Sequence, residues 1–561
     1  MIYIYKKYFA LGIIFILIVV TVNSSTSLQV NESNRTNETE SIEKLEICVK
    51  DGRGLTVEIW NNGSIDAENI QLNVDVEVGK LVLVPKKIYT IPYLAAGKST
   101  EVRVSIFGLG LAIFFEHPLI SITANSPGFN TVWTKVLTKL FGMSTKILTR
   151  ISNYNEPYQG YTLFSPEYST YTYLINIDGK IVHTWQSEYI QGFGTYLLEN
   201  GDLLRLDEFG SDIGFMAGGR AGRVEKFDNH SNLLWEFVYA NDEHCSHHDI
   251  EPLPNGNVLI IAWESKTRAE AISAGRNPNR LRSSTIWPDH VIEVEPVGSS
   301  GGNIVWEWHA WDHLIQDYNA TKENYGVVKN HPELIDLNFG NTDSDWTHIN
   351  AVDYNEKFDQ ILLSVHNFNE IWVIDHSTTT AEAAGHTGGT SGKGGDLLYR
   401  WGNPQAYDAG DVTDQQYFGQ HGANWIEKGC PGEGNIIVFN NGGESRRFSS
   451  VDEIVPPVDN SGNYEYEPGR AYGPDEPIWI YTTENPSDMY SMTLSNAQRL
   501  PNGNTLMCSA NQGLFLEVSQ EKEIVWKYQY HNILYPNANS VARVLRYSLD
   551  YPGIPTAESI N

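Results

Sequence analysis

The strongest constraint in this 561-residue chain is a repeated pair of segments. One segment is a turn of the type Leu-Pro-Asn-Gly-Asn, or a variant of it, next to an apolar run, and the other is an apolar run that ends in an aromatic pair such as Trp-x-Phe. The paired segments are 171–177 with 181–185, 198–204 with 233–237, 253–259 with 304–308, 359–363 with 397–401, 434–438 with 477–481, and 500–506 with 524–528. Long repeats rich in strand-forming residues predict an array of small sheets.

Asn-Gly supplies the positive φ angles of a tight hairpin, so the flanking runs are expected to be antiparallel strands. One such sheet cannot bury its own faces, whereas six sheets of about four strands can do so by packing radially. The terminal copies must then meet, with 545–549 as the closing segment against 158–165. The predicted fold class is therefore all-β, a six-bladed β-propeller over residues 158–550. A parallel β-helix is the alternative, which the long and unequal copies disfavour.

Ahead of the repeats, period-two runs at 55–60, 70–78 and 100–106 alternate with polar turns. This pattern predicts a small antiparallel β-sandwich over residues 45–125. Its segment Asn-Asn-Gly-Ser-Ile-Asp-Ala-Glu-Asn-Ile resembles immunoglobulin-like modules of exported prokaryotic proteins. We expect this domain to be a spacer with no binding role. Residues 126–157 are predicted to be a connector, with a short helix near 132–141.

The chain begins with two lysines and a 15-residue apolar run over 8–22. That length suits a signal peptide better than a membrane span, which needs about 20 residues. We interpret residues 1–27 as a signal peptide, or as an N-terminal membrane anchor if it is not cleaved, and 28–44 as a polar linker. Acceptor sequons for N-glycosylation start at Asn31, Asn34, Asn37, Asn62, Asn229 and Asn319. We therefore expect an exported glycoprotein, located extracellularly, at the cell surface or in the periplasm.

Charge and cysteine content exclude several classes of function. The formal net charge is −30, from 39 basic and 69 acidic residues, and so acidic a surface repels phosphate backbones. We expect no nucleic-acid partner. The four cysteines contain no Cys-x-x-Cys pair, which argues against a disulfide scaffold and a thiolate zinc site. No cofactor and no resident metal are predicted, and the oligomeric state is left open.

Histidines occur at matching points of three successive repeats. They are His247 and His248 in His-His-Asp-Ile, His348 in Asp-Trp-Thr-His-Ile-Asn-Ala-Val, and His421 in Gln-His-Gly-Ala. The innermost strands of a propeller line its channel, so equivalent positions converge near one axis. Burying several imidazoles together is costly unless they have a function. The channel mouth is therefore the candidate site, and strand parity leaves open which of His247 and His248 faces it.

These histidine motifs, with the repeated Leu-Pro-Asn-Gly-Asn turns, resemble the arylsulfate sulfotransferase (arylsulfotransferase) family over residues 158–550. The resemblance implies an exported six-bladed propeller that moves a sulfuryl group from an aryl sulfate ester to a phenol, in two steps through a sulfohistidine. By motif, His421 stands at the position of the nucleophile, and His348 and Asn350 stand at sulfuryl-binding positions. Where the family has an arginine on the following strand, this chain has His366, and a protonated His366 is expected to supply the cation. The implied partners are a small aryl sulfate donor and a phenolic acceptor.

Two other functions remain open from the sequence. Clustered imidazoles at one axis could hold Zn²⁺ or Cu²⁺. The export segment, sandwich and propeller could also form an adhesion protein without catalysis. Two tryptophans near the motifs, Trp346 and Trp425, either stack on an aryl substrate or pack between blades.

Overall fold

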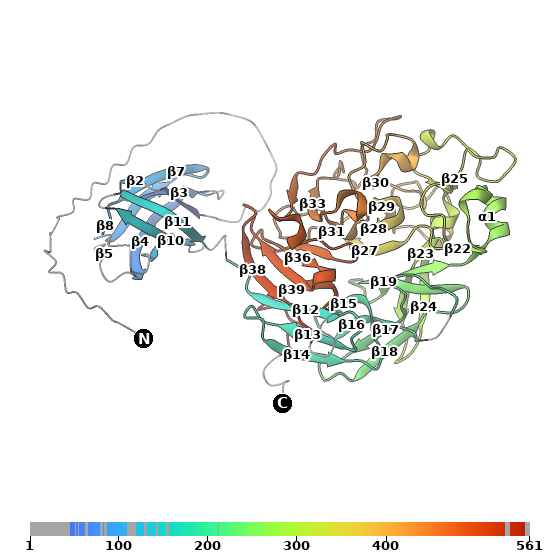
Figure 1. The fold of residues 1–561 in the computed structure, drawn as a ribbon, viewed down its shortest axis with the longest axis horizontal. Coiled ribbons are helices and arrows are strands. Elements are labelled where there is room, and N and C mark those ends of the chain that lie inside the picture. Colours follow the sequence, from blue (N-terminus) through green and yellow to red (C-terminus); the bar gives the residue numbers. More distant parts are fainter. Residues whose placement is uncertain are drawn as a thin grey trace, which may run out of the picture. The chain divides into compact units, whose positions relative to one another are not determined.

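The computed structural model describes residues 45–555 apart from short gaps. The gaps are 51, 54, 62–64, 79–81, 84–86, 109–118, 128–131, 142–143, 153–155, 211–212 and 533–538. The interpretations of residues 1–27 and 28–44, and the sequons at Asn31, Asn34, Asn37 and Asn62, lie outside the described residues. The chain divides into two compact units, Met1–Glu156 and Pro157–Asn561. Figure 1 shows the elements of each unit.

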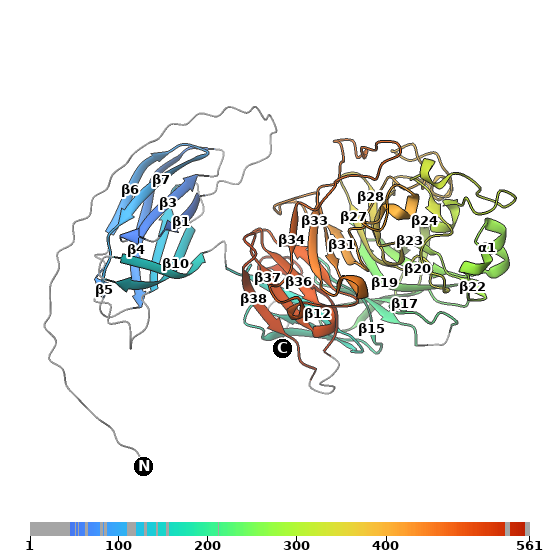
Figure 2. The same cartoon turned by 45° about the horizontal axis from the view of Figure 1, so that its top comes forward.

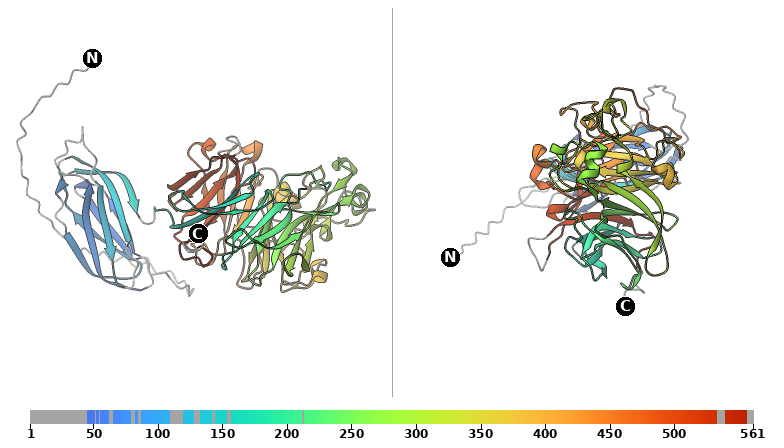
Figure 3. Two further views of the ribbon diagram at one scale, coloured as in Figure 1. Left: turned by 90° about the horizontal axis from the view of Figure 1, so that it is seen from below. Right: turned by 90° about the vertical axis from the view of Figure 1, so that its right-hand side faces the viewer.

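The first unit is a sandwich of two antiparallel sheets. Its smaller sheet has the order β1-β3-β7 and its larger sheet the order β2-β11-β10-β9-β4-β6 (Figures 2 and 3). The strands are β1 (Leu45–Lys50), β2 (Gly52–Arg53), β3 (Leu55–Asn61), β4 (Ala67–Val78), β6 (Lys87–Leu94), β7 (Lys98–Val104), β9 (Leu119–Asn125), β10 (Val132–Phe141) and β11 (Ser144–Ser152). Alternate residues of β3, such as Val57 and Ile59, are buried. They form one core with Leu72 and Ile122 of the other sheet, as period-two patterning requires.

The connector predicted for 126–157 is wrong, and so is its short helix. β10 pairs antiparallel with β9 and with β11, so this segment extends the larger sheet of the sandwich. The sequence of β10 is rich in Val, Thr, Trp and Phe, residue types that favour strands. The neighbouring edge of β9 offers hydrogen-bonding partners along its length, and this tertiary pairing overrides the helical propensity of Leu and Lys.

The second unit contains six four-stranded antiparallel sheets. We number them as blades 1 to 6 and give the strands from the innermost outward. Blade 1 is β39 (Val541–Ser548), β12 (Gly160–Pro166), β13 (Tyr171–Ile175) and β14 (Ile181–Gln186), and blade 2 is β15 (Gln191–Leu197), β16 (Leu203–Glu208), β17 (Gly222–Phe227) and β18 (Leu233–Val238). Blade 3 is β19 (His244–Pro252), β20 (Val258–Glu264), β23 (Asp289–Pro296) and β24 (Gly302–His309), and blade 4 is β27 (Ile349–Asn355), β28 (Gln360–Val365), β29 (Glu370–Asp375) and β30 (Tyr399–Trp401). Blade 5 is β31 (His421–Trp425), β32 (Ile436–Asn440), β33 (Ser450–Ile454) and β34 (Trp479–Tyr481), and blade 6 is β35 (Asn496–Arg499), β36 (Thr505–Ser509), β37 (Leu514–Val518) and β38 (Ile524–Gln529).

The innermost strands form a closed ring. Around it, β15 contacts β19, β19 contacts β27, β27 contacts β31, β31 contacts β35, β35 contacts β39, and β39 contacts β15. This closed order of contacts is that of a six-bladed β-propeller, which confirms the predicted fold class. The closing pair is also confirmed, because β39 pairs antiparallel with β12 and Leu545 lies opposite Leu163. In Figure 1 the red β39 lies beside the teal β12.

The two repeated segments, the Asn-Gly turn and the run with the aromatic pair, have different structural roles. In the turns that follow three inner strands, Gly201, Gly256 and Gly503 have φ angles of 89°, 89° and 87°, which only glycine adopts readily. A tryptophan of the outermost strand donates its indole N–H to the next blade in all six described blades. The pairs are Trp185 with Asp228, Trp235 with Gly301, Trp306 with Thr378, Trp401 with Pro474, Trp479 with Gln520, and Trp526 with Ile177. The Trp-x-aromatic repeat therefore joins each blade to its neighbour.

Candidate active site

The inner strands begin at one end of the channel, where all six blades contribute to a small cavity. Its lining residues are Phe193, His248, Asn350, His421, Gly422, Leu494, Ser495, Ala542 and Arg543. The histidines predicted from three repeats therefore do meet. Five imidazoles form a continuous series through His247, His248, His348, His366 and His421, with successive ring centroids 5.1, 4.5, 5.0 and 5.2 Å apart.

Irregular backbone places these side chains. His248 and His348 have φ angles of 56° and 55°, and Phe193 has one of 89°. Strand pairing shifts register at the start of β15, β19, β27 and β31. Positive φ in a non-glycine residue costs roughly 1–3 kcal/mol and is concentrated at functional sites. Each bulge breaks the alternation of its strand, and the side chains that line the cavity next to these bulges are Phe193, His248, Asn350 and His421.

The bulge in β19 settles the choice between the two adjacent histidines. His248 lines the cavity, whereas the fully buried His247 lies behind it and stacks on Trp263 with ring centroids 3.9 Å apart. His247 Nε2 lies 2.6 Å from Asp289 Oδ1, and its Nδ1 lies 2.9 Å from His248 Nδ1.

These contacts assign the tautomers of the pair. Asp289 accepts from His247 Nε2–H, and in the tautomer of His247 that carries this one proton, Nδ1 accepts the Nδ1–H of His248. His248 Nε2 is then left with a lone pair. Burial, with the charge of His348, holds the pKa of His248 well below its usual range, so this ring is a neutral acceptor.

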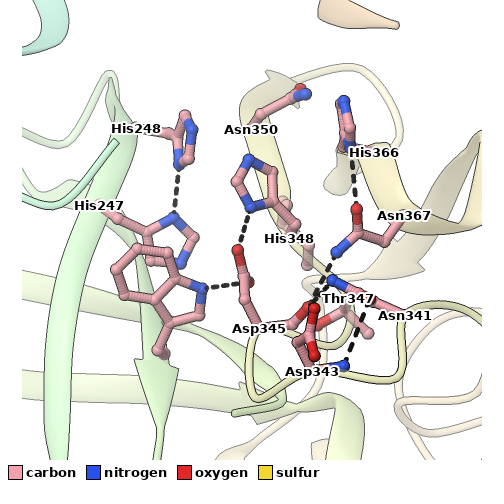
Figure 4. A network of polar contacts seen from close by, with 12 residues as sticks. His247, His248, Asn341, Asp343, Asp345, Thr347, His348, Asn350, His366 and Asn367 are labelled. Atoms are coloured by element: carbon pink, nitrogen blue, oxygen red, sulfur yellow. Dashed lines mark hydrogen bonds and ion pairs between the residues drawn. The ribbon is translucent and has the colours of Figure 1, made fainter. Parts of the chain in front are cut away.

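The pKa of His348 is shifted in the opposite direction from that of His248. Its Nδ1 bonds Asp345 Oδ2, and Asp345 Oδ1 also accepts from Trp263 Nε1 at 3.0 Å (Figure 4). Burial lowers the pKa of His348, but the charge and hydrogen bond of Asp345 outweigh burial and raise the pKa above its ordinary value. Figure 4 shows the other ring nitrogen of His348 directed away from Asp345, toward the end where His248, Asn350 and His366 lie.

His421 is held as a neutral ring with one defined lone pair. Its Nδ1 lies 3.0 Å from Gly419 O and 2.9 Å from Asn441 Oδ1. Asn441 donates through Nδ2 to the carbonyls of Ser491 and Leu494, which fixes its oxygen toward His421. Both partners of Nδ1 accept, so Nδ1 carries the proton and Nε2 the lone pair. Burial, with the neighbouring His366, holds the pKa of His421 well below its usual range.

His366 lies beside His421 but does not supply the cation expected of it. Burial, with the charge of His348, lowers the pKa of His366 to about 4. Its Nδ1 lies 2.9 Å from Asn367 Oδ1, and Asn367 donates to the backbone oxygen of Asp345. Near neutral pH the ring is therefore uncharged, which contradicts the expectation of a protonated His366; burial is the main cause, and the neighbouring His348 adds to it.

A cation missed by sequence reasoning lies on the closing strand. Arg543 of β39 lines the cavity with His248 and His421, and its guanidinium bonds Asp249 Oδ2 and the hydroxyl of Tyr196. These described contacts use two of its five N–H donors. The available signal was the pair of arginines in the otherwise apolar Val-Ala-Arg-Val-Leu-Arg run, because a buried arginine requires an anionic partner.

Asn350 presents an acceptor to the cavity. Its Nδ2 donates to Gln420 O at 2.8 Å, and its buried Oδ1 has no partner among the described residues. A buried oxygen without a hydrogen bond costs about 1–3 kcal/mol of stability, so a ligand that donates a hydrogen bond to Asn350 Oδ1 would be stabilised.

Trp346 and Trp425 are buried and absent from the lining of this smaller cavity. Among the described lining residues, Phe193 is the aromatic one.

A second cavity of about 910 Å³ lies at the other end of the channel, where the inner strands run into the Asn-Gly turns. Arg543 lines both cavities, and Glu251, Asp353 and Glu427 line the larger one. Burial raises the pKa of Asp353 to about 7. The basic side chains of Lys226, Arg499 and Arg546 also line the larger cavity, so its charge is mixed. The smaller cavity is lined by Arg543, His248 and His421, and the ring centroid of His348 lies 4.5 Å from that of His248. The convergence of imidazoles makes the histidine end the better candidate site.

The metal alternative for the channel is not favoured by the ligand geometry. Among the described residues, one group of His, Cys, Asp and Glu ligands has three ligand atoms within 4.8 Å of one another, and it comprises His313, His386 and Asp396. None of these residues lines the channel cavity.

No helix in the described part of the chain is long and apolar enough to cross a membrane.

Comparisons with known proteins bear on this site. A family model described as Arylsulfotransferase (ASST) matches residues 138–543. No curated protein sequence matches the chain. Similar solved structures include a protein of unknown function from Bacteroides caccae, with 11% identity, coverage of 70% of this chain and 99% of that chain, and a TM-score of 0.37. A putative 6-phosphogluconolactonase from Bacteroides fragilis has 11% identity, coverage of 70% and 98%, and a TM-score of 0.35. A streptogramin B lyase has 9% identity, coverage of 69% and 90%, and a TM-score of 0.33.

Proposed function

The chain belongs to the arylsulfotransferase family, and on that premise we propose that it moves a sulfuryl group from an aryl sulfate to a phenol through a covalent intermediate on His421. The observation that carries this proposal is the hydrogen bonding of His421. Gly419 and Asn441 hold its proton on Nδ1, so the lone pair of Nε2 is available without any prior deprotonation.

In the first half-reaction, Nε2 of His421 attacks sulfur and the bond from sulfur to the aryl oxygen breaks. The protonated His348 gives its Nε2 proton to the departing aryl oxide, which leaves as a phenol. His421 then carries the SO₃ group on Nε2, and His348 is neutral. The raised pKa of His348 supports its role as the acid, because the other imidazoles that contact it, His248 and His366, have lowered pKa values.

Negative charge on the sulfuryl oxygens needs a positively charged environment during transfer. Arg543 lines the cavity, and a protonated His348 beside His248 would add a second positive charge; preorganised charges of this kind stabilise the transition state strongly. Arg543 thus takes the role that the sequence assigned to His366.

In the second half-reaction, an acceptor phenol attacks the sulfur of the intermediate and its proton passes to His348, which regenerates both histidines. Asn350 Oδ1 and the lone pair of His248 suit the hydroxyl group of that acceptor. Phe193, whose ring centroid lies 6.0 Å from that of His248, offers an aryl contact.

The test uses the purified full chain with 4-nitrophenyl sulfate as donor and a phenol as acceptor. We expect transfer, and a sulfated His421 peptide in mass spectra after donor alone. His421→Ala should lower transfer roughly 10³-fold or more and remove the sulfated peptide. His230→Ala, which changes an exposed turn residue, is the matched control. Transfer that survives in His421→Ala would reject the nucleophile, and a wild type without transfer would favour the non-catalytic adhesion protein.

We also propose that the chain acts outside the cytoplasm. The support is the two lysines followed by the apolar run over 8–22, with the sequons that follow it. Protease added to intact cells should cleave the chain if it is anchored at the surface, and the chain should appear in the medium or periplasm if the segment is removed. Retention inside protected spheroplasts would contradict both forms of the proposal.

A further inference from the structure

Away from the channel, two histidines and an aspartate converge where blades 3 and 4 meet. His313 follows β24 of blade 3, after the short 3₁₀ helix Ala310–Asp312. His386 and Asp396 belong to the loop between α2 (Thr380–Ala383) and β30 of blade 4. His313 Nδ1 lies 2.8 Å from Asp396 Oδ1, and His386 Nδ1 lies 2.7 Å from the same oxygen. The three ligand atoms are all within 4.8 Å of one another.

The second nitrogen of His313 fixes how its ring can act. Nε2 lies 2.8 Å from the carbonyl oxygen of Ala383, which can only accept, so Nε2 must carry a proton. In a neutral ring Nδ1 then has a lone pair that faces the carboxylate of Asp396, and two acceptors oppose each other. Either a second proton or a metal ion resolves this opposition.

The surroundings favour a bound cation. A backbone carbonyl that holds the remote N–H of a histidine is the usual outer contact of a metal-ligating imidazole. The His313 side chain is fully buried and its ring stacks on Trp308 at an interplanar angle of 6°. Gly395 passes so close that a Cβ atom there would lie 2.6 Å from His313 Nε2. The ring is therefore fixed in one orientation before any ligand arrives.

We propose that His313, His386 and Asp396 bind a divalent transition metal ion of the Zn²⁺ class. Two imidazoles and one carboxylate are a zinc donor set, with water as the fourth tetrahedral ligand. The side chain of His386 is 60% exposed, so the site has an open side. Zinc at about 2.0–2.1 Å from each ligand would separate the ligand atoms by about 3.3 Å. Each imidazole nitrogen would then move slightly away from Asp396 Oδ1, which the glycine-rich loop 385–395 allows.

The bound ion would link two blades. Trp308 Nε1 of β24 already donates to Gly395 O at 2.7 Å, and the ion would fasten the same loop to His313. The loop carries an exposed lysine, Lys393, which is a trypsin site. Binding should therefore protect this bond from cleavage, a readout that does not depend on sulfuryl transfer.

The experiment uses the full chain made without an affinity tag, stripped with a chelator and then titrated with Zn²⁺ or Co²⁺. We expect one equivalent of zinc, the visible spectrum of tetrahedral Co²⁺, and slower trypsin cleavage after Lys393 in the presence of metal. His386→Ala should weaken binding at least tenfold and abolish the protection. His331→Ala is the matched control, because His331 is also half-exposed and also bonds one carboxylate, that of Glu333.

Two outcomes would overturn the proposal. The first is a stripped wild type that takes up no metal at micromolar zinc. The second is binding that survives in His386→Ala but is lost in His421→Ala, which would place the ion in the channel. Neither outcome depends on whether the chain transfers sulfuryl groups, so this inference and the proposed function fail separately.

Discussion

At the scale of single residues, chemically identical imidazoles in one cluster are forced into different charge states. Asp345 raises the pKa of His348, although burial opposes it. Burial lowers the pKa of His248 and His421, which have carbonyl, amide or imidazole partners in place of a carboxylate. Groups whose pKa values are pushed apart in this way are suited to separate acid and nucleophile roles.

Arg543 should be needed for transfer and not only for stability. Arg543→Met alone leaves Asp249 buried without its partner, a loss that costs about 3–5 kcal/mol. Adding Asp249→Asn should restore most of the free energy of unfolding, while kcat/KM for 4-nitrophenyl sulfate stays roughly 10²–10³-fold lower. Urea unfolding and steady-state kinetics on both variants measure the two effects. Recovery of activity in the double variant would reduce Arg543 to a structural residue.

The lowered histidine pKa values predict that the protein loses stability in acid. His366 has a pKa of about 4 when folded and about 6.5 when unfolded, so the unfolded state binds its proton first as pH falls. Stability from this group is therefore lost between pH 6.5 and 4, by up to about 3 kcal/mol. His366→Gln should flatten the decline of the urea midpoint over this window. An unchanged slope would show that His366 is not a buried neutral ring.

The sequence located much of the site and left its electrostatics undetermined. His348, Asn350 and His421 could be placed by motif, because their repeats put them at matching points of inner strands. The choice between His247 and His248 could not be made, because a bulge in β19 breaks the alternation on which parity depends. Arg543 was missed because ring closure, and not any nearby motif, brings it to the cavity. The state of His366 depends on its neighbours in space.

At the scale of elements, side chains at the ends of strands join neighbouring blades. His376, just after β29 of blade 4, has Nδ1 at 2.7 Å from Asp359 Oδ1 in its own blade. Its Nε2 lies 3.1 Å from Glu293 Oε2 on β23 of blade 3. Burial lowers the pKa of His376, but the two carboxylates outweigh burial and raise it to about 9. Blades 3 and 4 are thus linked by an imidazolium ion.

This link should weaken in alkali. A group whose pKa is raised on folding contributes its full stability below about pH 6.5 and loses it as pH rises through 9. The wild type should therefore exceed His376→Gln in unfolding free energy by up to about 3 kcal/mol at pH 6, and the gap should close by about pH 10. Urea unfolding across this range measures it, with His230→Gln as the control. A gap that does not depend on pH would mean that packing, and not charge, provides the link.

At the scale of the whole molecule, the fold follows from the repeat. Six copies that each form one sheet must close a ring, and the chain ends complete blade 1 together. The prediction of a connector with a helix over residues 132–152 is wrong, because this segment lies outside the repeats and its structure is decided by pairing with the neighbouring strand β9. Blade 1 is also the one place where two strands that pair side by side come from opposite ends of the unit. This seam is therefore held without a hairpin across it.

One buried network fastens the seam. Arg546 of β39 donates to Thr162 Oγ1 of β12 and to the carbonyl of Tyr158, both at 2.6 Å, and it forms an ion pair with Glu517 of blade 6 at 3.2 Å. The side chains of Arg546 and Glu517 are both fully buried. Glu517 also accepts from the backbone N–H of Tyr158 at 2.6 Å. The first strand, the last strand and blade 6 thus depend on one pair of charges.

Arg546→Met should leave the carboxylate of Glu517 buried and unpaired, and lower the free energy of unfolding by about 3–5 kcal/mol. Arg546→Met with Glu517→Gln should recover much of that loss, because glutamine is neutral and still accepts from Tyr158. Hydrogen exchange should show the single variant opening first at β12 and β39, since no hairpin joins these strands. If protection is lost evenly around the ring, closure is not the weakest step, and the blades must unfold as one cooperative unit.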